Sequence, residues 1–176
     1  MCGIVGYTGP KEAYPIVITG LKRLEYRGYD STGVALMDQG LKVYKKKGRV
    51  SELEQTIFGK NLHAHTGIGH TRWATHGEPS DRNAHPHISA SGKLAMIHNG
   101  IIENHDELRD DLKRAGYEFT SETDTEVIAH RVHKHLATQK DLFKAVRATV
   151  AELEGAYALA VISENDPERI ILAREG

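Results

Sequence analysis

The stretch Cys2-Gly-Ile-Val-Gly-Tyr7 opens the chain as a short apolar run, which Gly9 and Pro10 bring to an end. A run of this length bounded by turn residues predicts a buried strand that starts at the chain terminus. Cys2 then stands at the end of that strand. Because a small side chain at the second position permits removal of Met1, Cys2 is expected to carry a free α-amine beside its thiol.

An α-amine and a thiol on one residue predict an N-terminal nucleophile. The reference pKa is about 7.7–8.0 for the amine and about 8.5 for the thiol, so the amine can accept the thiol proton near neutral pH. The alternative, favoured by composition alone, is that Cys2 is a small buried hydrophobe on an edge strand. The other motifs of the chain have to decide between the two.

Composition restricts the class of protein. The 176 residues favour one domain, and 39% hydrophobic residues together with 17 glycines are typical of a globular chain. A formal net charge of −1 argues against electrostatically driven binding to nucleic acid or to a membrane surface. A single cysteine excludes an intramolecular disulfide and fits a reducing compartment. With no signal-peptide pattern and no apolar segment of about 20 residues, a soluble cytoplasmic protein is expected.

Hydrophobic periodicity predicts a mixture of strands and helices. The predicted strands are 2–7, 33–37, 41–45, 67–71, 94–98, 156–162 and 169–173, and the predicted helices are 11–26, 49–60, 104–115, 123–136 and 141–154. Asn104 and Thr123 are expected to start capping boxes, and Gly116 and Gly155 to end helices. Because βαβ alternation is missing, we expect the α+β class, with antiparallel sheet and covering helices.

Four further motifs accompany the Cys2 run. They are Leu24-Glu-Tyr-Arg-Gly-Tyr-Asp30 followed by Ser31, His70-Thr-Arg-Trp-Ala-Thr-His-Gly77, His98-Asn-Gly-Ile-Ile-Glu-Asn104 and Ser121-Glu-Thr-Asp-Thr-Glu126. With them the sequence resembles the N-terminal glutaminase domain of the glucosamine-6-phosphate synthase family, a class II glutamine amidotransferase. The resemblance implies a four-layer αββα sandwich of the N-terminal nucleophile (Ntn) hydrolase type, with mainly antiparallel sheets inside and Cys2 at the mouth.

The resemblance identifies residues 1–176 as one glutaminase domain that is shorter than the family domain at its C-terminal end and lacks the sugar-isomerase domains. The chain stops at Ala173-Arg-Glu-Gly176, directly after an apolar strand. If strands beyond Gly176 complete a sheet, an unpaired edge is expected here. The family partners would be L-glutamine and the sugar-isomerase domains of the parent enzyme, through which a homodimer would form.

The reaction implied by the resemblance begins with attack of the Cys2 thiolate on the side-chain amide of glutamine. Ammonia leaves, and water hydrolyses the γ-glutamyl thioester to glutamate without a metal or an organic cofactor. The family residues that stabilise the oxyanion correspond to the side chain of Asn99 and the backbone N–H of Gly100. The alternative interpretation of this dipeptide is a hairpin turn, because Asn-Gly is a strong hairpin signal, and such a turn could also present the N–H.

Glutamine carries a carboxylate and an ammonium, for which the resemblance assigns Arg72 and Asp124. Without the resemblance, Arg72 is expected in a surface ion pair and Asp124 as a first-turn acid of a helix. Trp73 and residues 74–80 resemble the family's glutamine loop, which closes over substrate, with Thr75 and His76 at its start; the alternative is an ordinary exposed loop.

Arg27 matches a family arginine that lies near the nucleophile and would order its amine.

Three other interpretations of the chain stay open. The first is a metal site, which the eleven histidines suggest. The absence of an HExxH motif and of a cysteine cluster favours solvated or structural histidines instead. A different amidotransferase or an amide hydrolase would share the nucleophile, although residues 24–30 and 70–77 resemble the hexosamine branch. A non-catalytic module would retain Met1.

Overall fold

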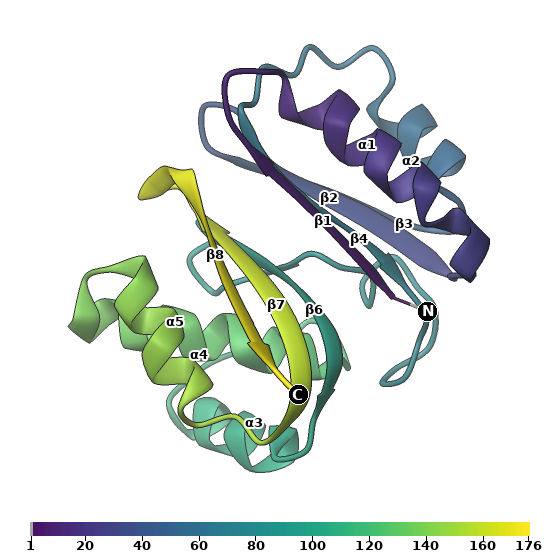
Figure 1. Cartoon of the computed structure of the whole chain (residues 1–176). Helices are drawn as coiled ribbons and strands as arrows, with labels where there is room; N and C mark the ends of the chain where they lie inside the picture. The colour runs from purple at the N-terminus through teal and green to yellow at the C-terminus, as the bar shows by residue number, and fades with distance from the viewer. Residues whose placement is uncertain (1) are drawn as a thin grey trace.

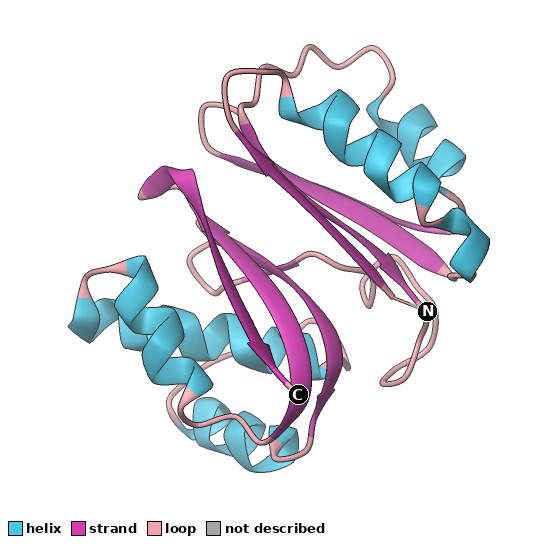
Figure 2. Cartoon of the chain, viewed as in Figure 1, coloured by secondary structure: helices cyan, strands magenta, loops and turns pink. Residues whose placement is uncertain are grey.

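The computed structural model describes residues 2–176, so the expected removal of Met1 lies outside the described part. Two four-stranded sheets lie face to face, and helices cover the outer face of each sheet (Figure 1). Figure 2 shows this order plainly, with the helices on both outer sides and all the strands between them. The prediction of an α+β sandwich with four layers is confirmed.

The first sheet has the strand order β1-β4-β2-β3, and every pairing in it is antiparallel. The helices α1 and α2 pack against it through an apolar cluster that includes Val17, Leu21 and Leu53. The bounds are β1 (Gly3–Thr8), α1 (Ala13–Arg23), the 3-10 helix η1 (Glu25–Arg27), β2 (Ser31–Met37), β3 (Leu41–Lys47), α2 (Val50–Ile57) and β4 (Thr66–Arg72).

Strand β4 shows why α1 can lie so close to this sheet. Its residues alternate between the two faces, and glycines occupy the face toward α1. A Cβ atom on Gly69 would lie 2.5 Å from Cγ1 of Val17, closer than side-chain atoms can approach. Ile68, on the other face of β4, packs instead in the layer between the two sheets.

The second sheet has the order β5-β6-β7-β8, and its pairings are also antiparallel. Its helices pack on it through the largest apolar cluster, which includes Leu112, Val127 and Leu159. The bounds are β5 (His87–Ile88), β6 (Leu94–Ile102), α3 (His105–Arg114), α4 (Asp124–Gln139), α5 (Leu142–Val150), β7 (Gly155–Ser163) and β8 (Asp166–Glu175). Among the described helices, none is long and apolar enough to cross a membrane.

The alternative interpretation of Asn99-Gly100 as a hairpin turn is wrong. Both residues lie inside β6 and pair with Ala158 and Tyr157 of β7. Gly100 has φ +114°, and a Cβ atom there would lie 2.2 Å from the carbonyl oxygen of Ala156. The glycine thus serves a close approach of two strands and does not reverse the chain.

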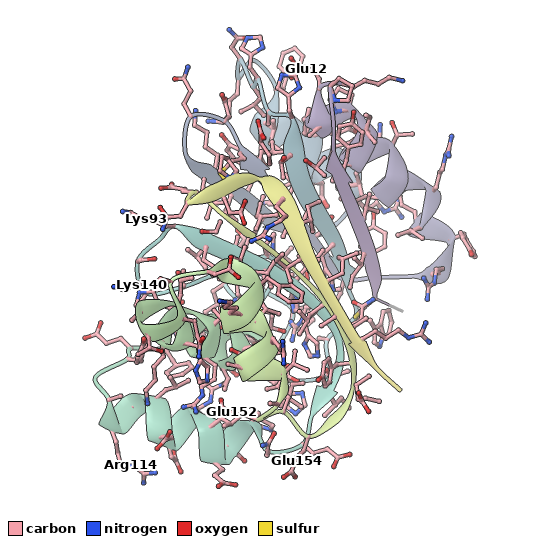
Figure 3. The ribbon with its side chains drawn as sticks, turned by 60° about the vertical axis from the view of Figure 1, so that its left-hand side comes forward. Glu12, Lys93, Arg114, Lys140, Glu152 and Glu154 are labelled. Carbon is pink, nitrogen blue, oxygen red and sulfur yellow. The ribbon has the colours of Figure 1, made fainter. Side chains whose placement is uncertain are left out.

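One predicted helix end and one predicted helix cap are also wrong. Helix α5 ends at Val150, and Gly155 begins β7 opposite Ile102. Asn104 precedes α3, but its amide caps no helix: Nδ2 donates to the Glu152 carbonyl at 2.8 Å and Oδ1 accepts from the Glu154 N–H at 3.0 Å. Figure 3 labels these two glutamates at the connection from α5 to β7 (Figure 3). The Asn104 side chain therefore joins the start of α3 to the connection between α5 and β7 and does not cap α3.

The cap predicted at Thr123 is confirmed, since its Oγ1 accepts from the Glu126 N–H at 3.4 Å. The Glu126 carboxylate does not close a reciprocal box. It accepts instead from the backbone N–H groups of Thr120 and Ser121, at distances down to 2.6 Å. These bonds fix the turn that leads into α4, whose first residue is Asp124.

Candidate active site

Cys2 lies just before β1 and is held by groups from both sheets. Its Sγ accepts from the backbone N–H of Trp73, which follows β4, at 3.2 Å. Its carbonyl oxygen accepts from Nδ2 of Asn99, on β6, at 3.2 Å. The thiol is half-buried and reduced, so it remains accessible while a backbone N–H points at the sulfur. This contact holds the sulfur at a fixed place beside the segment that follows β4.

A cavity of about 240 Å³ adjoins Cys2. Its walls come from Cys2, the end of β4 and the segment after it, the segment before β5, strand β6 and the start of α4. The described residues that line it are Cys2, Arg72, Trp73, Thr75, His85, His98, Gly100, Ile101, Thr123, Asp124 and Thr125. Six of the predicted site residues are therefore together in one cavity, and Asn99 contacts Cys2 beside it.

Asp124 occupies the first position of α4 and is buried. Its Oδ2 accepts from the backbone N–H of Ile102, the last residue of β6, at 3.0 Å, and Oδ1 lies 3.9 Å from Nδ1 of His98. Asp124 is thus a first-turn acid and also a wall of the cavity. A buried carboxylate at that place can receive an ammonium group, and this role remains a prediction.

Arg72 ends β4 and is only 3% exposed, so the surface ion pair expected from composition is wrong. Its Nη2 donates to the carbonyl oxygens of His76 and Gly77, and Nη1 donates to that of Glu78 at 3.4 Å. Burial lowers the pKa of the Arg72 guanidinium, against the opposing effect of nearby carboxylates, first among them Asp30. The side chain holds the following loop at the edge of the cavity.

The segment that follows β4 forms neither helix nor strand over residues 74–80. Trp73 exposes 55% of its surface although its backbone holds the Cys2 sulfur. Thr75 lines the cavity, whereas the imidazole of His76 packs edge-on against His105, with ring centroids 4.8 Å apart. His76 is outside the set of described lining residues, and its contact with substrate remains a prediction.

Arg27 ends the short 3-10 helix η1 and is half-buried. It is likewise outside the described lining residues of the cavity, and its role near the nucleophile remains a prediction. Asp30, in the same motif, has a clear task that sequence reasoning missed. Its Oδ2 accepts from the Ala74 N–H at 2.7 Å, and its own N–H donates to the Arg72 carbonyl at 2.7 Å. Asp30 thereby fixes the backbone that carries Trp73.

Four histidines are buried between the sheets and near the start of α4. The rings of His70 and His85 stack with centroids 4.0 Å apart, and those of His85 and His87 meet edge-on at 4.9 Å. Burial is the largest cause that lowers the pKa of His70, His85, His87 and His98. Each of these four side chains has a hydrogen-bond contact with a neighbouring residue. Over residues 2–176, no three His, Cys, Asp or Glu side chains form a group that could hold a metal ion.

A comparison with known protein families identifies the family of this chain. Residues 70–176 match the model of the glutamine amidotransferase domain. The chain belongs to this family. The matched part of this glutamine amidotransferase domain carries Arg72, Asn99, Gly100 and Asp124, while Cys2 directly precedes β1, the strand that pairs with β4.

Relatives and solved structures agree with the family. The glutamine amidotransferase chain is 56% identical, over 100% of its length, to the glutamine–fructose-6-phosphate aminotransferase [isomerizing] of Aquifex aeolicus and covers 30% of that protein. It is 51% identical to the protein of that name from Methanosarcina acetivorans, covering 99% of this chain and 30% of that protein. The chain therefore spans about 30% of the length of these curated relatives.

A solved structure of glutamine phosphoribosylpyrophosphate amidotransferase from B. subtilis, complexed with ADP and GMP, superposes on this amidotransferase chain with a TM-score of 0.83. The two are 29% identical, and the match covers 98% of this chain and 37% of the other. The αββα arrangement is therefore shared with an amidotransferase of lower identity than the relatives above.

Proposed function

We propose that this chain hydrolyses the side-chain amide of L-glutamine to glutamate and ammonia through a γ-glutamyl thioester at Cys2. The observation that carries the proposal is the meeting of Cys2 with Asn99, Gly100 and Asp124 around one small cavity. These residues offer a nucleophile, two oxyanion donors and an anion for the substrate ammonium. No metal or organic cofactor is needed for any of these steps.

The first step is attack of the Cys2 sulfur on the amide carbon. The α-amine of Cys2, once Met1 is removed, takes the thiol proton and passes it to the leaving ammonia. The negative charge that develops on the amide oxygen is stabilised by N–H donors from Asn99 and Gly100. Water then attacks the thioester, the sulfur leaves, and glutamate is released with the thiol restored.

The second part of the proposal concerns substrate recognition. Asp124 binds the ammonium of glutamine and Arg72 its carboxylate. A guanidinium has five N–H donors. Arg72 can therefore bind a carboxylate and keep its hydrogen bonds to the carbonyl oxygens of residues 76–78. Binding of glutamine would therefore order Trp73, Thr75 and the loop that follows them.

The chain is further proposed to be the glutaminase part of a cytoplasmic glutamine–fructose-6-phosphate aminotransferase. Its identity is 56% to a relative of that name and 29% to the phosphoribosylpyrophosphate amidotransferase structure, and this difference supports the choice. Residues 1–176 would belong to the glutaminase domain. Sugar-isomerase domains of the parent enzyme would use the ammonia to convert fructose 6-phosphate to glucosamine 6-phosphate and would supply the contacts of a homodimer.

The test combines mass spectrometry with a glutamate assay. Intact mass establishes whether Met1 is present, and an aminopeptidase removes it where it is retained. A glutamine-analogue diazo-ketone is expected to add once per chain, at Cys2, and excess glutamine is expected to block the addition.

The matched variant is Cys2→Ala, which is expected to release no glutamate and take up no label, because it lacks the nucleophile. Its circular dichroism spectrum and melting temperature are expected to match those of the wild type. A chain with a free Cys2 amine that neither reacts with the diazo-ketone nor releases glutamate would refute the proposal.

A further inference from the structure

His70 lies on β4 and reaches across to the opposite sheet. Its Nε2 is 2.8 Å from Oδ1 of Asn99 and 3.0 Å from the carbonyl oxygen of His98, both on β6. The side chain is fully buried, and its ring is stacked on that of His85. The imidazole therefore has a fixed place beside the amide that was assigned to the oxyanion.

The contacts of His70 determine where its hydrogen lies. A backbone carbonyl oxygen can only accept, so the contact with His98 requires a hydrogen on Nε2. Burial lowers the pKa of His70 to about 3, so the ring is neutral near neutral pH and carries one N–H group. Nδ1, which has no hydrogen-bond partner among the described residues, is then the unprotonated nitrogen.

A donor at Nε2 of His70 also determines which way the Asn99 amide faces. An amide presents an acceptor oxygen on one side and an NH₂ donor on the other. Because the N–H of His70 points at this amide, its oxygen must face His70. Nδ2 of Asn99 then faces Cys2, where it donates to the carbonyl oxygen at 3.2 Å. In the reversed orientation Asn99 would present an acceptor to a developing negative charge.

We propose that His70 is a positioning residue that holds the Asn99 amide with its N–H groups toward Cys2, so that this oxyanion donor is set before glutamine binds. The inference rests on the proposed function, because it explains how one donor of that site is oriented. A preset donor stabilises the transition state without reorganisation during the reaction. His70 acts through Asn99 and is outside the described lining of the cavity.

The test compares two variants of His70. His70→Leu removes the donor, whereas the side-chain NH₂ of His70→Gln can still donate near the place of Nε2. In His70→Leu, kcat for glutamine hydrolysis is expected to fall by about 10- to 100-fold with KM unchanged, less than for outright removal of an oxyanion donor. His70→Gln is expected to recover most of the loss. In an Asn99→Ala background, His70→Leu is expected to have no further effect on kcat.

Alkylation of Cys2 by iodoacetamide separates positioning from general damage, because displacement of iodide forms no oxyanion. An unchanged alkylation rate in His70→Leu is expected. A rate that falls as much as kcat would overturn the proposal, and so would an unchanged kcat or effects that add to those of Asn99→Ala. The matched control is His133→Leu, a histidine of α4 that pairs with the Tyr117 hydroxyl and is expected to retain the wild-type kcat.

A second measurement does not depend on catalysis. In nuclear Overhauser spectra, the Nδ2 protons of Asn99 are expected to contact protons of Cys2 in the wild type and in His70→Gln but not in His70→Leu. Contacts that persist in His70→Leu would overturn the proposal. Absence of glutamate release by the wild type would refute the proposed function instead, and these contacts would still decide whether His70 orients the amide.

Discussion

The two halves of the layer between the sheets differ in chemistry. Away from Cys2 the layer is apolar, and its buried side chains are Ala35, Met37, Ile68, Ala95, Ile97, Ala160 and Ile162. Toward Cys2, β4 continues from Ile68 to His70 and β6 continues from Ile97 to Asn99. On both β4 and β6, a step of two positions therefore leads from a close-packed aliphatic side chain to a hydrogen-bonded polar one.

The difference shows how one interface serves stability and chemistry in separate places. Burial of aliphatic groups stabilises the sandwich without directional demands. A buried polar group costs stability unless it is hydrogen-bonded. In the polar half, histidines of the second sheet reach the start of α4: His98 contacts the Thr125 hydroxyl at 2.9 Å, and His87 contacts that of Thr123 at 2.9 Å. Directional bonds there fix orientation where a reaction requires it.

The largest effect is expected from damage to the apolar half. Ile97→Ala removes a fully buried side chain and leaves a cavity, so the free energy of unfolding is expected to fall by roughly 2–5 kcal/mol. Urea unfolding measures the change, and kcat of the folded variant is expected to stay at the wild-type value.

The matched control is Leu172→Ala on β8, where the side chain is 71% exposed and the change is expected to stay within about 0.5 kcal/mol. Equal destabilisation by the two variants would show that the apolar half does not carry the stability attributed to it.

Damage to the polar half is expected to have the opposite signature. Asn99→Ala removes an oxyanion donor, so kcat is expected to fall by roughly 10²- to 10³-fold, with a smaller effect on KM. Steady-state assays of glutamate release measure both constants. Asn104→Ala, the same substitution in the amide that joins α3 to the α5–β7 connection, is expected to lower the melting temperature and preserve kcat. A change confined to KM in Asn99→Ala would make it a binding residue.

Acid is expected to affect the polar half selectively. The pKa of His70 is about 3 in the folded chain, below its ordinary value of 6.5, so the unfolded chain binds more protons below pH 6.5. The free energy of unfolding therefore decreases as the pH falls from 6.5 toward 3, by roughly 1.4 kcal/mol per pH unit for this group alone. Denaturation series at several pH values measure the slope, and His70→Gln is expected to reduce it. A stability that stays constant over this interval would contradict the assignment.

The smallest effect is expected at the edge of the cavity. Arg72→Lys replaces a forked donor by a point charge, so KM for glutamine is expected to rise by about tenfold, or ~1.4 kcal/mol, with kcat less affected. Arg82→Lys is the matched control, because Arg82 is exposed and pairs with Glu122 outside the cavity. If KM stayed unchanged in Arg72→Lys, the carboxylate contact would lie elsewhere.

Local patterns predicted most of the fold, because period-two and helical spacing reflect which face of an element is buried. They failed where a distant segment decides the conformation. The turn signal of Asn99-Gly100 is overridden by pairing with β7. The Asn104 side chain is hydrogen-bonded to the α5–β7 connection and does not cap α3. The two-residue strand β5 is too short to show a pattern.

The site divides in the same way. The motifs identified Cys2, Asn99 and Asp124 as residues with chemistry, and the structure brings them together. They did not identify His70 as the partner of Asn99, because that contact depends on the facing of two sheets across 29 positions of sequence. Asp30 was within a motif, but its bond to the Ala74 backbone could not be inferred from spacing.

The bond between the Asn99 amide and the Cys2 carbonyl joins residues 97 positions apart and crosses from one sheet to the other. Neither sheet alone can bring nucleophile and donor together, however complete its own strands are. Contacts of such long sequence separation form late when a chain folds, since closing a large loop has a high entropic cost. During refolding, glutaminase activity would therefore return later than secondary structure. The time course of glutamate release would then report when the two sheets dock.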